Sequence, residues 1–146
     1  MSKSDTWETG LLKLLFQNIA FTGVGDAGGL LPSATAGNLY LSLHTADPGE
    51  AGDQTTNEVS YGSYARQAIA RSTSGFTVTG NSVSPAADVS FPKGTSGALS
   101  SALYLGIGTA LSGAGKLLYS GPLASPIPFG LNVTPQVLAT SALTED

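Results

Sequence analysis

The side chains of this chain that could take part in acid–base or nucleophilic chemistry are few and lie close together in sequence. His44 is the only histidine, and histidine is the side chain whose ordinary pKa lies near neutrality. Ser42 or Ser60 could supply a nucleophile and Asp47 an orienting carboxylate, as in a Ser-His-Asp triad. Neither serine lies in the pattern that exposes a nucleophile on a sharp turn. We therefore expect His44 to lie on the outer face of a strand, with catalysis as the alternative.

Four carboxylates fall in one turn-rich stretch and could together bind a cation. Carboxylate and carbonyl oxygens are the ligands that a hard cation such as Ca²⁺ requires. Their spacing matches no cation-binding loop, and carboxylates beside turn residues are commonly solvated, so we expect no metal and no cofactor. A glycosidase would need two carboxylates facing each other across a cleft, and nothing marks such a pair. The four residues are Asp47, Glu50, Asp53 and Glu58.

The composition describes a weakly charged chain without cysteine. Only 11% of its 146 residues are charged, well below the common quarter, and 19 are glycine. The absence of cysteine excludes disulfides and is compatible with synthesis in a reducing cytosol. A neutral, hydroxyl-rich surface suits a protein held at high density in an assembly, and it equally suits an ordinary all-β domain with many turns.

The charge pattern argues against nucleic acid and membranes as partners. The formal net charge is −4, and the six basic residues are scattered, so no basic stripe is available to neutralise phosphates. No segment approaches the roughly 18 apolar residues that span a bilayer. The apolar run near the N-terminus follows acidic residues instead of the basic start of a signal peptide, so we expect no export by that route.

The chain begins with a predicted amphipathic helix of about four turns. Asp5 followed by Glu8 resembles a capping box at its start. Glycines between positions 23 and 29 are expected to end the helix and to form a flexible connection. The apolar stripe either packs on its own domain or swings away to dock on a neighbouring subunit. The stripe comprises Trp7, Leu11, Leu14, Leu15 and Ile19, and Leu12 and Phe16 widen it.

The remainder of the chain alternates apolar and polar residues in short runs separated by turns, which indicates antiparallel strands. In the run 38–44, Leu39, Leu41 and Leu43 share one face, which we predict to be core. We therefore predict a mainly β fold: a helix and Gly-rich connection over residues 1–30, followed by an antiparallel jelly-roll-like β-sandwich with about eight strands over residues 31–146.

Several details of the later strands follow from the same alternation. Leu103, Leu105 and Ile107 should face inward in a strand over 101–108, which forms a hairpin with the strand that starts near Leu117. A separate strand is expected over 127–133, and Pro126 and Pro128 should place it at a sheet edge. The last strand is predicted over 137–143.

Four segments within residues 39–123 resemble a family of small structural proteins of tailed bacteriophages. They read LYLSLHTADPGEAG, TNEVSYGSYARQAIARS, GNSVSPAADVSFP and GIGTALSGAGKLLYSGPL. The combination of LHTADPG with NE followed by YAR is the most specific part. Members are often described as tail fibre proteins, and the family is similar to the capsid cement proteins of short-tailed phages.

This resemblance implies a virion component without enzymatic activity. It implies a jelly-roll capsid cement or decoration protein that binds the major capsid protein on the capsid exterior, stabilises contacts between capsomers, and is made in the cytoplasm of a host bacterium. The alternative is a tail or tail-fibre component that takes part in attachment to the host surface. We also expect a homo-oligomer, most simply a two-fold dimer. The candidate interface residues are Trp7, Leu11, Leu15, Tyr61, Tyr64 and Arg66.

Overall fold

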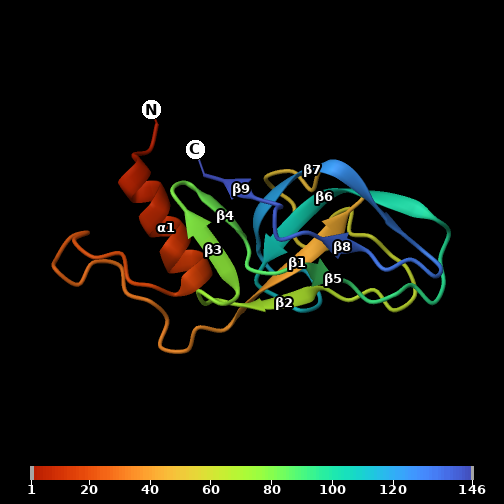
Figure 1. Ribbon diagram of the computed structural model, residues 1–146, viewed down its shortest axis with the longest axis horizontal. Helices are drawn as coiled ribbons and strands as arrows, with labels where there is room; N and C mark the ends of the chain where they lie inside the picture. Colours follow the sequence, from red (N-terminus) through yellow and green to blue (C-terminus); the bar gives the residue numbers. More distant parts are fainter. Residues whose placement is uncertain (1, 146) are drawn as a thin grey trace. The chain divides into compact units, whose positions relative to one another are not determined.

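The structure, a computed structural model, describes residues 2–145, and its regular secondary structure is mainly β-strand (Figure 1). The described part contains one helix and nine strands, which confirms the predicted mainly β class with an N-terminal helix. The elements are α1 (Asp5–Gln17), β1 (Asn38–His44), β2 (Gln67–Ala70), β3 (Phe76–Thr79), β4 (Ser82–Pro85), β5 (Val89–Ser90), β6 (Ser100–Gly108), β7 (Leu117–Phe129), β8 (Gln136–Val137) and β9 (Leu143–Thr144).

The strands form three sheets. One has four strands in the order β2-β1-β6-β7, one has three in the order β3-β4-β9, and one pairs β5 with β8. The registers described between strands are all antiparallel, as predicted. The finer expectation of a jelly roll is not confirmed, because a jelly roll arranges eight strands in two sheets.

The chain divides into two compact units, each built from separate stretches of sequence. The first unit contains the described residues of 2–38, 69–87 and 138–145, and the second contains residues 39–68 and 88–137. The helix α1 therefore shares its unit with β3, β4 and β9. The division into residues 1–30 and 31–146 stays a prediction.

In the first unit, α1 begins one residue earlier than the capping pattern indicated. Ser4 is the N-cap, and its hydroxyl oxygen accepts a hydrogen bond from the Trp7 backbone N–H at 3.4 Å. The expected capping box of Asp5 with Glu8 is therefore wrong, because Asp5 already lies inside the helix. At the other end, Asn18 closes the helix with a left-handed backbone (φ 56°).

The face of α1 that packs inside the first unit is not the predicted stripe. Leu12 and Phe16 are fully buried and Glu8 nearly so, which is the i, i+4, i+8 spacing of one helix face. Phe16 meets Phe76 of β3 edge to face, with ring centroids 5.0 Å apart. Trp7, in contrast, remains 37% exposed. Leu12 and Phe16, which were expected only to widen the stripe, form the centre of the buried face, because the helix packs on the β3–β4 hairpin.

Arg71 ties the C-terminal end of α1 to the segment that follows it. Its guanidinium donates hydrogen bonds to the carbonyls of Leu14 at 2.8 Å and Leu15 at 2.6 Å, and to the carbonyl of Ala36 at 3.0 Å. The last carbonyls of a helix lack partners within the helix and carry partial negative charge, so a cation there is favourable. Arg71 therefore holds the helix end by charge and by hydrogen bonding.

The Gly-rich connection after α1 is a closed loop instead of an open linker. Phe21 and Leu30 exchange two backbone hydrogen bonds, at 3.0 and 2.9 Å. Gly29 has a φ of 64°, and a Cβ there would clash with the Phe21 carbonyl, so the close approach requires glycine. The ring of Phe21 packs against Trp7, with centroids 5.4 Å apart. The two ends of the connection are therefore bonded to each other, while its flexibility stays a prediction. The expectation that its glycines end the helix is wrong, because α1 already ends at Gln17 with Asn18 as its C-cap.

The two ends of the described chain meet in the first unit. The Lys3 ammonium forms an ion pair with the Glu145 carboxylate. The Glu145 backbone N–H donates to the Asn81 carbonyl at 2.8 Å, and the Asn81 amide donates back to the Glu145 carbonyl at 3.1 Å. The single last strand predicted over 137–143 is wrong, because β8 and β9 are two short strands that pair with different partners.

The second unit contains the strand pattern that sequence alternation predicted best. Leu39, Leu41 and Leu43 of β1 are all buried. The predicted hairpin is confirmed as β6 with β7. The predicted edge position is also confirmed for the proline-rich part, although residues 127–129 belong to the end of one long strand, β7, instead of a separate one.

One inward-facing residue was misassigned in β6. Leu103 is 43% exposed, whereas Ala102 and Ile107 are buried. The register of β6 on β7 shifts between Ala102 and Tyr104, and such an irregularity reverses the side-chain alternation on its two sides. Leu103 therefore cannot share the face of Ile107.

The described part has no helix that is both long and apolar enough to cross a lipid bilayer.

The packing of α1 gives a stability test within the first unit. Replacing Phe16 by Ala leaves a cavity against Phe76, and large-to-small changes of this kind lower the free energy of unfolding by about 3–5 kcal/mol. Replacing Leu31, which is 73% exposed, by Ala is the matched control and should change it by less than about 0.5 kcal/mol. Urea unfolding followed by circular dichroism measures both. Equal, small effects would contradict the assigned packing of α1.

Candidate functional site

The side chains of β1 that could take part in chemistry lie in the interior of the second unit. Ser42 and His44 are fully buried, although they point to the face opposite the leucines. The expected position of His44 on an outer strand face is wrong, because the loop after β1 covers that face: the buried side chain of Gln54 and the backbone of Thr56 belong to this loop. Both faces of β1 are thus covered.

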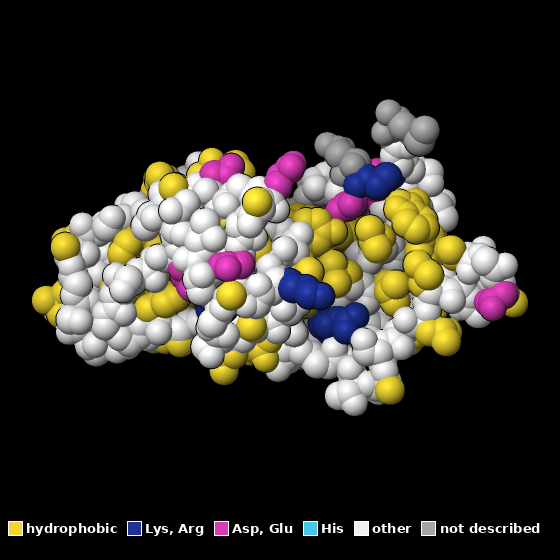
Figure 2. Space-filling view, turned by 180° about the vertical axis from the view of Figure 1, so that it is seen from behind, with side chains coloured by type: hydrophobic (Ala, Val, Ile, Leu, Met, Phe, Trp, Pro, Cys, Tyr) yellow, Lys and Arg dark blue, Asp and Glu magenta, His cyan; other side chains and the backbone are white. Residues whose placement is uncertain are grey.

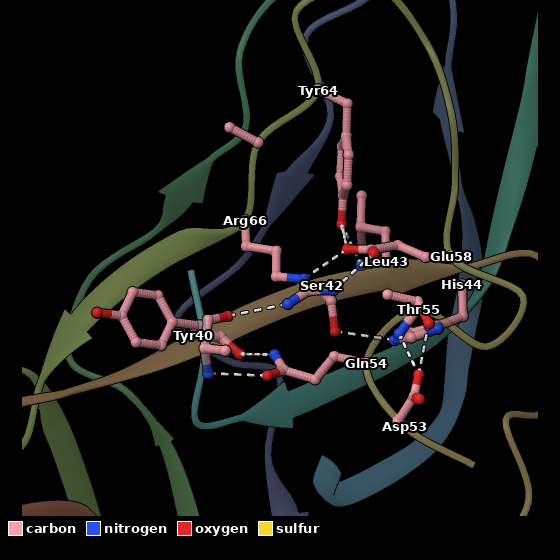
Figure 3. Close-up of polar contacts among 12 residues, drawn as sticks. Tyr40, Ser42, Leu43, His44, Asp53, Gln54, Thr55, Glu58, Tyr64 and Arg66 are labelled. Atoms are coloured by element: carbon pink, nitrogen blue, oxygen red, sulfur yellow. Dashed lines mark hydrogen bonds and ion pairs between the residues drawn. The ribbon is translucent and has the colours of Figure 1, made fainter. Parts of the chain in front are cut away.

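His44 joins its own strand to the covering loop (Figure 3). Its Nδ1 lies 2.8 Å from the Thr56 carbonyl oxygen, and its Nε2 lies 2.8 Å from Ser42 Oγ. A carbonyl can only accept, so Nδ1 carries the hydrogen and Nε2 accepts from the Ser42 hydroxyl. The neutral imidazole therefore satisfies both of its nitrogens here.

This arrangement brings together only two members of the triad considered above. The Ser42–His44 contact is present, but the third position is taken by a backbone carbonyl, while the Asp47 carboxylate accepts from the Gly49 backbone N–H at 2.9 Å. Ser60 is exposed and is not part of the cluster. A Cβ at Gly106 would clash with both His44 and Ser42, so the space beside the pair is filled. Both side chains are fully buried, and their hydrogen bonds join the strand to the loop.

Next to this pair lies a buried ion pair. Arg66 is only 4% exposed, and its guanidinium donates to both Glu58 oxygens, from Nε at 2.7 Å and from Nη2 at 2.8 Å. Its Nη1 donates to the Ala110 carbonyl at 3.0 Å. The hydrogen bond to Glu58 raises the pKa of Arg66 above its ordinary value. The Tyr64 hydroxyl donates to the same carboxylate at 2.8 Å and accepts from the Leu43 backbone N–H at 3.2 Å.

Gln54 is a member of the cluster that sequence reasoning missed. Its side chain is fully buried; its Oε1 accepts from the Ala110 backbone N–H at 2.9 Å, and its own backbone N–H donates to the Ala114 carbonyl at 2.9 Å. A Cβ at Gly108 or Gly115 would clash with the Gln54 side chain. The signal in the sequence was therefore the pair of glycines near the hairpin turn, which leave room for a side chain more than fifty residues away.

The carboxylates considered for a cation have other roles. Asp53 accepts from the Thr55 hydroxyl at 2.6 Å and from its backbone N–H at 2.7 Å, and these hydrogen bonds lower the pKa of Asp53. Glu58 is paired with Arg66. Within residues 2–145, no three His, Cys, Asp or Glu side chains are grouped so that they could hold a metal ion.

The candidate interface residues fall into two groups. Arg66 and Tyr61 are buried, and the Tyr61 hydroxyl donates to the Pro92 carbonyl at 2.9 Å while its ring stacks on Phe129. Tyr64, also engaged within the second unit, is half-buried, as are Leu11 and Leu15 in the first. Trp7 is the exposed member of the set. Contacts of all six with another protein stay a prediction.

An open groove lies in the second unit between the loop after β1 and the first part of β7. Its volume is about 540 Å³, which is within the usual range for binding sites of roughly 300–1,000 Å³. The loop contributes Asp47, Gly49, Glu50 and Gly52, and β7 contributes Leu117, Leu118, Tyr119 and Ser120.

The buried ion pair makes a sharp prediction. Glu58→Gln would leave the Arg66 guanidinium buried without its counter-charge, and breaking such a pair costs about 3–5 kcal/mol of unfolding free energy. The matched control is Glu50→Gln, which removes an exposed carboxylate outside the ion pairs and should have little effect. A double variant with Arg66→Met should lose less than the sum of the two single variants, as expected for residues in contact. Additive losses in urea unfolding would contradict the pairing.

His44 makes a prediction about pH. Burial lowers the pKa of His44 below its ordinary 6.5, so the unfolded chain takes up this proton at a higher pH than the folded chain does. The contribution to stability is therefore complete above pH 6.5 and is lost as the pH falls from there to the folded pKa. Because the sequence has one histidine, NMR titration of its imidazole signal measures the value directly. A midpoint at or above 6.5 would contradict the buried, neutral imidazole.

The comparisons with known proteins identify the family. The family model described as podophage GP4 fiber I protein gp80 matches residues 2–140, nearly the whole described chain. No curated protein matches the chain. The resemblance to structural proteins of short-tailed phages is thus confirmed at that level. The chain belongs to the family of podophage GP4 fiber I protein gp80 and is a structural protein of a short-tailed phage virion.

Proposed function

We propose that the chain is a non-enzymatic accessory subunit on the outside of the phage capsid, where it binds the major capsid protein and reinforces contacts between capsomers. The observation that carries this proposal is the use of the reactive side chains: Ser42, His44, Glu58 and Arg66 all bond to one another or to the backbone inside the second unit. Because these side chains join the loop to the sheet, they support a structural role for the chain.

The surface charge is compatible with that position. With a net charge of −4, the chain is not attracted to the packaged nucleic acid, so binding can be directed to protein. Low charge also limits repulsion between copies packed closely on a capsid. Neither nucleic acid nor membrane is part of the proposal.

The first unit offers an apolar surface for contact with protein. Figure 2 shows hydrophobic side chains gathered on the face of the unit that carries α1, with basic side chains beside them. Exposed apolar residues of this unit include Trp7 at 37%, Ile19 at 40% and Leu31 at 73%. Tryptophan is enriched among the residues that dominate binding energy, so Trp7 is the proposed anchor.

A second candidate is a subunit of a fibre instead of a capsid decoration protein. The observation in its favour is the description of the matched family, which names a fiber I protein. The acidic, weakly charged surface fits either location, so position on the particle is the property that separates them.

Self-association accompanies either role. A symmetric dimer is the simplest closed assembly. Each bound dimer would make twice as many contacts with the particle as a single chain does. Sedimentation at several concentrations measures the oligomeric state, and Trp7→Ser tests whether the α1 surface contributes.

Labelling of intact particles tests the proposed location. Antibody against the chain should label the whole head if the chain decorates the capsid, and heads stripped of the chain should rupture at a lower temperature. Label confined to the tail region would instead support the fibre candidate. Particles without label would overturn both.

A surface variant tests the proposed contact. Trp7→Ser should weaken rebinding of the purified chain to stripped particles by at least roughly tenfold, the effect of about 1.4 kcal/mol. Leu99→Ser, which changes a residue 73% exposed in the second unit, is the matched control and should rebind normally. Equal rebinding of both variants, with unchanged thermal unfolding, would contradict the role of Trp7.

A further inference from the structure

We propose that the first part of β7, residues 117–121, binds an extended, basic peptide segment of another virion protein by adding it as a strand to the sheet. The partner is a virion protein because of the function proposed above. The proposal itself is carried by three observations in the second unit: an open strand edge, a groove along that edge, and uncompensated negative charge in the groove.

The edge is open because β7 ends its sheet. The order β2-β1-β6-β7 leaves one side of β7 without a paired strand among residues 2–145. Prolines interrupt this edge further along, at positions 122, 126 and 128, and proline cannot donate a backbone hydrogen bond. Residues 117–121 contain no proline. The available edge is therefore this short section.

The ladder geometry shows which backbone group on this section faces outward. Residues in an antiparallel pair alternate between positions bonded to the partner strand and positions that face away. Pro122, opposite Tyr104, has no N–H to give to β6, so it occupies a position that faces away. The register runs without a shift from that pair to Ser120 opposite Gly106, two residues on. The Ser120 N–H therefore faces away from β6 as well, toward the open edge.

The groove follows the edge instead of one face of the sheet. Side chains of successive strand residues point to opposite faces. The groove is nevertheless lined by four successive residues, 117–120. The register on β6 shifts between Leu117 and Tyr119, so regular alternation holds only for Tyr119 and Ser120. A hollow that touches both of these neighbouring residues opens along the edge of the strand. An extended peptide is the shape that can occupy such a space, because it pairs its own backbone with the strand.

The opposite wall of the groove determines the charge of the peptide. Asp47 and Glu50 line it, and neither has an ion-pair partner in the described structure. Gly49 lies between them and Gly52 follows, and neither carries a side chain, so backbone can approach closely. A lysine or arginine on the added strand would reach these carboxylates, and such complementarity selects the partner and its direction.

Peptide binding to the full-length chain tests the proposal. The probes are short overlapping peptides that cover the other structural proteins of the same phage, together with peptides covering this chain itself, and the readout is fluorescence anisotropy. We expect at least one Lys- or Arg-containing peptide from another virion protein to bind, with affinity that falls as salt is raised.

Three variants locate the binding, two at Ser120 and one double variant of the carboxylates. Ser120→Pro removes the outward N–H without touching the bonds to β6 and should abolish binding, whereas Ser120→Ala keeps the N–H and should bind normally. Asp47→Asn with Glu50→Gln should weaken binding roughly tenfold and flatten its salt dependence, the loss expected for charge pairs at a binding site. Circular dichroism and thermal unfolding confirm that each variant is folded.

Three outcomes would overturn the proposal. The first is that no peptide of another virion protein binds, and the second is that only a peptide of this chain binds, which would make the groove a site of self-association. The third is that a folded Ser120→Pro variant binds as tightly as the parent chain. The peptide-binding results are independent of particle labelling. If no peptide binds, the proposed virion location is unaffected. If the antibody does not label particles, peptide binding measured at the groove remains valid.

Discussion

A guanidinium group taken out of water must be paired, and the second unit is arranged around that requirement. Arg66 comes from the end of the covering loop, Glu58 from its middle, and the Ala110 carbonyl from the turn after β6. Burial of either charge without the other would be strongly unfavourable. The pair therefore fixes the path of the loop over β1, and with it the burial of His44 and the position of the groove wall at Asp47 and Glu50.

Local pattern predicted the strands where alternation is not interrupted. The leucines of β1, the β6–β7 hairpin and the edge position of the prolines all follow from period and from the missing proline N–H. Prediction failed where contact with residues distant in the sequence determines which side chains are buried. Leu103 turned outward because of a register shift between strands, and the buried face of α1 centres on Phe16 because Phe76 lies opposite it. Neither cause is visible within a window of neighbouring residues.

In the candidate site, the sequence indicated the reactive side chains but not their hydrogen-bond partners. The sequence indicated that His44, Ser42 and the carboxylates of the loop were the groups worth attention, and the structure does bring the first two together. It could not indicate that Thr56 would supply a carbonyl or that Gln54 would fit against Gly108. Polar groups in an interior are satisfied by whatever backbone the topology places there, so their partners depend on the whole fold.

The first unit draws on three stretches, and its final strand, β9, pairs with β4 from the middle of the sequence. A ribosome adds residues from the N-terminus at roughly 5–20 per second, and units tend to fold as their sequence emerges. The helix and the β3–β4 hairpin must therefore wait for residues 138–145 before their sheet is complete, whereas all of the second unit has by then been made. The order of synthesis thus favours maturation of the sheet that bears the groove before closure of the unit that bears Trp7.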